Sequence, residues 1–160
     1  MSVKATLITL SAAAVLALGA ASASAQERPS YGPDVDLAAA KKMAAAAVAE
    51  AKKHNWNVAV AVVDNHGFLV YFEKLDQTQT ASVQVAIDKA RSAALYRRPT
   101  RAFEDAVTKG RVAVMNLTGV SVITGGLPIM KDGRVIGGIG ASGVLADQDE
   151  QVSKAGLAGM

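Results

Sequence analysis

Residues 125–143, with the sequence GGLPIMKDGRVIGGIGASG, decide the fold of this chain. Two apolar runs, at 127–131 and 134–142, flank the dipeptide Asp132-Gly133. Asp-Gly between two such runs is the strongest short signal for a β-hairpin, because a type I′ turn needs positive φ at both central residues. The stretch therefore predicts two antiparallel strands near the end of the chain.

The second predicted strand ends in six residues, 138–143, that match the G-x-G-x-x-G fingerprint of dinucleotide-binding proteins. That fingerprint requires a further parallel strand with an acidic residue about 20 residues on, and only residues 144–160 follow. We interpret the glycines instead as a flat trough on one strand face. A helix, a facing subunit or the plane of a ligand would fill it, and packing is favoured because strand glycines usually mark close backbone approach. If a ligand fills it, the floor candidates are Gly125, Gly126, Gly138 and Gly140.

The first 25 residues have the pattern of a secretory signal peptide. Lys4 precedes an apolar run at 5–20, and the small residues Ala23-Ser24-Ala25 provide a cleavage site. The run is too short and too rich in alanine for a stable membrane span, so no membrane insertion is expected after cleavage. We predict a protein exported to the periplasm or beyond, with Gln26 as its first residue.

Composition narrows the classes of function. The net charge of +3 falls by one when cleavage of the signal peptide removes Lys4. So small an excess of positive charge does not indicate a nucleic-acid-binding surface. Without cysteine, the chain has no disulfide, no thiolate ligand and no covalent haem attachment motif. Aromatic residues make up only 4% of the chain while small residues abound, which indicates close backbone packing and flat surfaces suited to homo-oligomers.

The remaining pattern predicts a single α/β (α+β) domain at 37–160, preceded by a flexible lead-in at 26–36. Helices are expected at 37–54 with Asp36 as N-cap, along the apolar stripe of 83–95, after the cap Thr100, and after the cap Asp147 with Glu150 at its third position. A five-stranded, mostly antiparallel sheet should pack against them. Its strands are expected at 58–63, 68–72, 120–124, 127–131 and 134–142.

Several stretches together resemble the GlcG/HbpS-like haem-binding proteins, also called the haem-degrading domain family. The most specific is AIDKARSAALYRRPT at 86–100, and residues 60–64, 125–129, 135–143 and 149–150 also match. The resemblance covers nearly all of 26–160. It implies a sheet packed against helices, dimers or larger oligomers and, for some members, haem binding outside the cytoplasm. Other members are accessory domains of cobalamin enzymes or are linked to glycolate metabolism.

A haem iron would need an axial ligand from His, Met, Tyr or another oxygen donor. His54 closes a lysine-rich helix end and is interpreted as a surface residue. The weak candidates that remain are His66 in a predicted turn, and Tyr96, Met115 and Thr118 near the second and third helices, each of which also has an ordinary packing or turn explanation.

Seven basic residues between 89 and 111 surround the break at Pro99. Haem propionates or a small carboxylic acid would bind such charges, because arginine engages a carboxylate through two hydrogen bonds. The alternative is a solvated helix face paired with Asp88, Glu104 and Asp105. The candidates for carboxylate binding are Lys89, Arg91, Arg98 and Arg101.

No classical catalytic pattern is present. Ser142 lacks the final glycine of a nucleophile elbow, and zinc-type spacing of His and Cys is absent. We therefore expect an exported protein that holds haem non-covalently for storage, protection or signalling. The alternatives are an enzyme that breaks haem down oxidatively and releases iron, and a non-haem module that binds a small organic acid.

Overall fold

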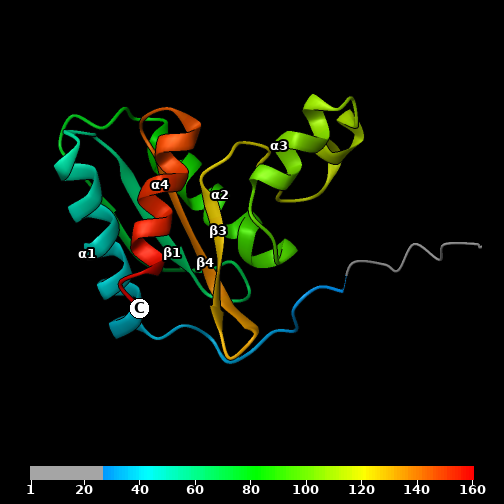
Figure 1. Ribbon diagram of the computed structural model, residues 1–160, viewed down its shortest axis with the longest axis horizontal. Helices are drawn as coiled ribbons and strands as arrows, with labels where there is room; N and C mark the ends of the chain where they lie inside the picture. The colour runs from blue at the N-terminus through cyan, green and yellow to red at the C-terminus, as the bar shows by residue number, and fades with distance from the viewer. Residues whose placement is uncertain (1–26) are drawn as a thin grey trace, which may run out of the picture.

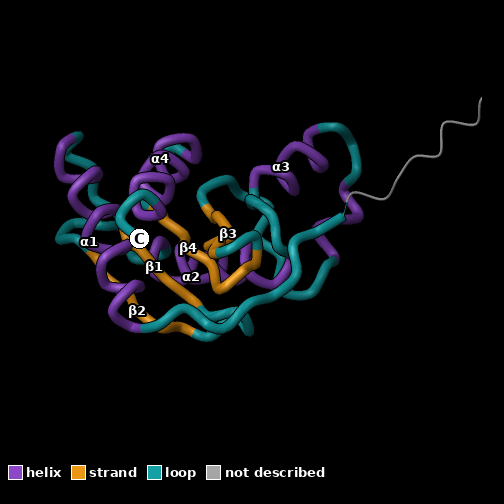
Figure 2. Tube along the Cα trace, turned by 60° about the horizontal axis from the view of Figure 1, so that its bottom comes forward, coloured by secondary structure: helices purple, strands orange, loops and turns teal. Residues whose placement is uncertain are grey.

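The computed structural model describes residues 27–160, so the predicted signal peptide lies outside the described residues. One sheet has the strand order β2-β1-β4-β3, and every neighbouring pair is antiparallel (Figure 1 and Figure 2). The single α+β domain is confirmed, with four strands in the sheet. The strands are β1 (Ala59–Val63), β2 (Leu69–Lys74), β3 (Gly126–Lys131) and β4 (Arg134–Ser142).

Helices cover both faces of the sheet, as Figure 2 shows. α1 and α4 pack against each other over one face, with Met43, Val60 and Ile139 fully buried between the layers. α2 covers the other face, where the packed side chains are mostly alanine. The helices are α1 (Leu37–Lys53), α2 (Ser82–Tyr96), α3 (Arg101–Thr108), the 3-10 helix η1 (Val112–Asn116) and α4 (Ala146–Leu157).

The Asp132-Gly133 turn forms as predicted. Both residues have positive φ, 50° and 72°, and join β3 to β4. The predicted N-cap of α1 also forms, since the Asp36 carboxylate accepts a hydrogen bond from the Ala39 N–H at 2.8 Å. Local side-chain chemistry therefore fixes these two boundaries.

The fifth strand predicted at 120–124 is wrong. This run lies in the irregular segment that follows η1, where α3 and η1 project away from the sheet (Figure 1). The Thr124 N–H donates to the Glu104 carboxylate of α3 at 2.7 Å instead of to a neighbouring strand. The β-branched composition of the run was right for a strand, but no sheet edge lies beside it.

Two predicted helix caps also differ from the structure. α4 begins at Ala146, one residue before the predicted cap Asp147, and the Gln148 side chain accepts from the Leu145 N–H at 3.2 Å. Thr100 does precede α3, but its hydroxyl makes no cap. It is fully buried and accepts a hydrogen bond from the Gly126 N–H at 2.9 Å, which ties the start of β3 to the α2–α3 connection.

The predicted flexible lead-in lies along β4 and is held by backbone hydrogen bonds. Ser30 O accepts from Val135 N at 2.9 Å, Gly32 N donates to Val135 O at 2.8 Å, and Val35 N donates to Ile136 O at 2.8 Å. We call residues 30–35 the strap. Because it crosses from the α2 side to the start of α1, it brings side chains from the beginning of the domain to the ends of β1 and α2.

None of the helices in residues 27–160 combines the length and the hydropathy that a membrane span requires.

Candidate functional site

A hollow of about 550 Å³ lies between the strap, the β1–β2 turn and the end of α2. Its volume is within the range of about 300–1,000 Å³ that is usual for small-molecule sites. Three large apolar side chains, Tyr31, Phe68 and Leu95, line it together with smaller and polar groups. We call it the Tyr31–His66 pocket; its lining residues are Tyr31, Gly32, Pro33, Asp34, Asn65, His66, Phe68 and Leu95.

The apolar walls come from distant parts of the sequence and are held in place. The Tyr31 hydroxyl donates to the Leu95 carbonyl at 2.8 Å, so the strap is fastened to the end of α2. Phe68 is 68% exposed and Leu95 is 37% exposed, so both present apolar surface to solvent at the hollow. Exposed apolar surface around a hollow is typical of a ligand site.

His66 belongs to a turn whose shape is fixed by Asp64. One carboxylate oxygen of Asp64 accepts hydrogen bonds from the His66 and Phe68 N–H groups, both at 2.9 Å. Gly67 takes a φ of +81°, which L side chains rarely adopt. The His66 ring makes no hydrogen bond to another side chain among residues 27–160, so this imidazole is free to bind a ligand.

Asn65 supplies a buried polar atom beside His66. Its backbone N–H donates to the Asp34 carboxylate at 3.1 Å, and its side-chain amide donates to Gly32 O at 2.7 Å. The side-chain oxygen is buried without a hydrogen-bond partner in the described part of the chain. An unsatisfied buried acceptor costs free energy, so it is a reason to expect a bound donor or water here.

Of the four residues predicted to bind carboxylates, Arg91 lies next to this pocket. Its Nε donates to Gly67 O at 3.0 Å, and its guanidinium is 4.0 Å from the Asp88 carboxylate. Arg98 lies at the α2–α3 junction, with its guanidinium 5.1 Å from the centre of the Phe103 ring.

The other two predicted carboxylate-binding residues already have acidic partners on α4. Lys89 is buried and bonded to Asp149 at 2.7 Å. Arg101 is bonded to Glu150 and Asp147, and these hydrogen bonds raise the pKa of its guanidinium above the usual value. The predicted basic cluster therefore does not form one surface. Lys89 and Arg101 pair with acidic residues of α4, and only Arg91 lies near one of the acidic residues expected as partners, Asp88.

The other candidate iron ligands lie around α3 and η1 and do not line the Tyr31–His66 pocket. The Tyr96 hydroxyl donates to Thr118 O at 2.6 Å, and the Tyr96 ring meets Phe103 edge-on. Met115 is 56% exposed on η1. Residues 27–160 hold no group of three or more His, Cys, Asp or Glu side chains that could bind a metal ion on their own.

The glycine trough is occupied by α2. A Cβ atom on Gly138 would lie 2.2 Å from the Ala90 carbonyl oxygen, and one on Gly140 would lie 2.4 Å from that of Ala86. A Cβ atom on Gly126 would lie 2.2 Å from the Lys89 carbonyl oxygen, and one on Gly125 would lie 2.8 Å from the Lys89 Nζ. These four residues therefore provide helix–strand contact, as the packing interpretation expects.

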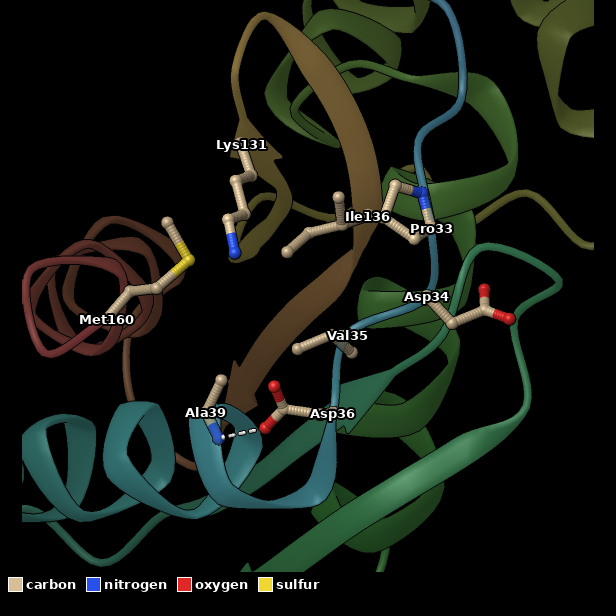
Figure 3. Close-up of a pocket in the computed structure, with 8 residues that line it drawn as sticks. All are labelled: Pro33, Asp34, Val35, Asp36, Ala39, Lys131, Ile136 and Met160. Carbon is tan, nitrogen blue, oxygen red and sulfur yellow. Dashed lines mark hydrogen bonds between the residues drawn. The ribbon is translucent and has the colours of Figure 1, made fainter.

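A second hollow, of about 280 Å³, lies on the opposite side of the strap and is drawn in Figure 3. Its walls are mainly aliphatic, from Val35, Ala39 and Ile136, and Met160 and Lys131 point into it. The nearby Asp36 carboxylate is already bound to the Ala39 N–H. With no aromatic ring and no histidine in its lining, this hollow is less suited to a large planar cofactor.

Sequence reasoning did not find Tyr31, Asn65, Phe68 or Leu95 as site residues. The turn sequence Asp64-Asn65-His66-Gly67 and the apolar Phe68 after it are visible in the sequence, but their meeting with Tyr31 depends on the course of the strap. A tyrosine between two prolines, Pro29 and Pro33, was the available signal that the lead-in carries a functional side chain.

The family model described as haem degrading protein HbpS-like matches residues 35–158. Protein GlcG of Escherichia coli strain K12 is 38% identical over 106 residues, which cover 64% of this chain and 79% of GlcG.

Two solved structures are similar over most of their length. HbpS has a TM-score of 0.75 and 32% identity, with 81% of this chain and 92% of HbpS covered. PduOC, solved as a complex with haem, has a TM-score of 0.74 and 27% identity, with 79% of this chain and 95% of PduOC covered.

Proposed function

Because this chain belongs to the HbpS-like family of haem degrading proteins, we propose that it binds haem non-covalently in the Tyr31–His66 pocket. The observation that carries the proposal is the placement of His66 among exposed apolar side chains in a hollow of about 550 Å³. The similar fold of PduOC, solved with haem, supports it.

The residues of the pocket fit the chemistry of haem. His66 would hold the iron through its imidazole, which is a common ligand of haem iron. Phe68, Tyr31 and Leu95 would contact the apolar face of the macrocycle, and Arg91 would pair with a propionate. Bound haem would supply an iron centre, and the chain would hold it through His66, the apolar side chains and Arg91.

A hemin titration of the mature protein tests this, followed by the Soret band. Wild type should bind saturably at micromolar hemin with a shifted Soret band. His66→Ala should bind roughly tenfold or more weakly, which corresponds to a loss of about 1.4 kcal/mol or more in binding free energy. His54→Ala is the matched control, because His54 lies at the end of α1, stacked on Trp56. Equal binding by both variants would remove His66 as the ligand, and no saturable binding by wild type would remove the function.

We further propose that the protein acts outside the cytoplasm after cleavage between Ala25 and Gln26. The support is the signal-peptide pattern of residues 1–25. Mass spectrometry of the exported protein should find Gln26 at the N-terminus, and a mature protein that retains Met1 would contradict the proposal.

We also propose that two copies of the chain associate through exposed apolar side chains on the projection formed by α3 and η1. Val112 is 60% exposed, Met115 56% and Leu117 42%. Burying such groups against a second copy would remove apolar surface from water. Light scattering at micromolar concentration should report a mass above that of one chain, and substitution of Met115 by Glu should lower it.

A second candidate function is oxidative breakdown of the bound haem, which the description of the matching family favours. Haem loss in the presence of ascorbate should then be faster with the protein than with free hemin or a non-specific protein. Equal rates would leave binding as the function.

A further inference from the structure

A separate hollow of about 180 Å³ lies where the chain enters the strap and meets the α2–α3 junction. Three arginines line it, Arg28, Arg97 and Arg98, with Glu27 as its acidic residue. Arg28 and Arg97 are 69 positions apart in the sequence, so only the course of the lead-in along the domain brings them together.

Two of these guanidinium groups are held in place by aromatic rings. The Arg97 side chain lies over Tyr31, 5.1 Å from the ring centre, and also donates to Pro29 O at 3.0 Å. Arg98 lies over Phe103 at 5.1 Å. Such stacking orients a guanidinium without neutralising it, so its edge remains available for hydrogen bonds.

The charge of these arginines is not compensated by ion pairs within residues 27–160. None of the three has an acidic side chain within 4.0 Å, whereas the nearby Arg101 is bonded to both Asp147 and Glu150. Arg97 also has a φ of +54°, a backbone conformation that costs free energy for a residue with a side chain. Because Arg28, Arg97 and Arg98 line one hollow, the fold holds like charges together, and their repulsion disfavours the empty state.

We propose that this hollow, the Arg28–Arg98 site, binds a compact, doubly charged oxyanion of the phosphate type. Three guanidinium groups opposed by one carboxylate leave two positive charges, which match a dianion. The small volume suits a single tetrahedral anion, and guanidinium edges provide paired N–H donors for its oxygens. The site is distinct from the Tyr31–His66 pocket, although Tyr31 contributes to both by lining one and supporting Arg97 in the other.

Isothermal titration of the haem-free mature protein with inorganic phosphate tests the proposal, at an ionic strength held constant with sodium chloride. Wild type should bind one phosphate saturably, and singly charged acetate should bind more weakly. Arg98→Gln and Arg28→Gln should each weaken phosphate binding roughly tenfold or more, because a charge-assisted hydrogen bond is lost. Arg111→Gln, a change of the same kind outside the hollow, should bind as wild type does.

Two results would overturn the proposal. One is the absence of saturable phosphate binding by wild type, and the other is an equal loss of binding in all three variants, which would indicate a general charge effect. A hemin titration of the same variants keeps the two sites apart. Failure of the oxyanion site leaves hemin binding by wild type intact, and failure of haem binding leaves phosphate binding intact.

Discussion

The Lys89 ammonium lies 2.7 Å from the Asp149 carboxylate inside the protein, with side chains only 1% and 4% exposed. Lys89 also donates to Ala141 O at 3.1 Å, and Asp149 accepts from the Val144 N–H at 3.2 Å. Burial raises the pKa of Asp149, while the charge of Lys89 acts in the opposite direction. The pair joins α2, the end of β4 and α4 at one point.

Removing one member of this pair should strongly destabilise the fold. Lys89→Ala leaves an uncompensated buried carboxylate, for which a loss of about 3–5 kcal/mol in the free energy of unfolding is expected. Chemical denaturation followed by circular dichroism measures it. The double variant Lys89→Met with Asp149→Leu should recover most of the loss, and a double variant as unstable as Lys89→Ala would contradict the explanation.

Gly138→Ala should be costly because the added Cβ would lie 2.2 Å from the Ala90 carbonyl oxygen of α2. The expected loss in the free energy of unfolding is about 3 kcal/mol or more, the upper end of the range for an overpacked core, because the added atom would clash with backbone. Gly110→Ala is the comparison, since Gly110 has open space around it and a positive φ of 87°. It should lose only about 1–2 kcal/mol from backbone strain, and equal losses at the two positions would argue against the close contact with α2.

Thr100→Val should leave the buried Gly126 N–H without its hydroxyl acceptor. The expected cost is about 1–3 kcal/mol in the free energy of unfolding, the penalty for an unsatisfied buried donor. Thr108→Val makes the same chemical change on an exposed hydroxyl that bonds to Glu104 O, and should change stability by about 0.5 kcal/mol or less. If the two variants unfold at the same denaturant concentration, Thr100 does not hold β3 as described.

Acid should weaken the contact between α1 and α4 at Glu50. Hydrogen bonds from Gln151, Lys53 and His54 lower the pKa of Glu50 from 4.5 to about 2. A lowered folded-state pKa means that this stabilisation is complete above pH 4.5 and is lost as the pH falls towards 2. The difference in stability between wild type and Glu50→Gln should therefore shrink between pH 5 and pH 2. A difference that stays constant across this range would contradict the assignment.

Three features could be predicted because each depends on residues close together in sequence. They are the hairpin at Asp132-Gly133, the central strand β1 and the Asp36 N-cap of α1. Residues close together in sequence could not show that the expected fifth strand would fail to form. Residues 120–124 have strand-like composition, but a strand also needs a partner, and the projection of α3 and η1 takes this run away from the sheet edge.

The site was harder to predict for the same reason. His66 is a recognisable turn residue, yet its apolar surroundings include Tyr31, which reaches the turn only through the strap. Lys89 looks like one more member of a basic surface cluster, although it lies beside Ala86 and Ala90 on the buried stripe of α2. Its partner Asp149 is 60 positions away, so no local pattern identifies it.

The glycines of β3 and β4 set where α2 lies, and with it the placement of both proposed sites. Because these glycines carry no side chains, the backbone of α2 lies directly against the strands at their positions, and this contact places Leu95 and Arg97 at the end of the helix. A substitution that lifts this helix would also alter the Tyr31–His66 pocket and the Arg28–Arg98 site. Loss of ligand binding is therefore no proof that a residue touches the ligand, and variants along this helix–strand contact should be assayed for stability and for binding together.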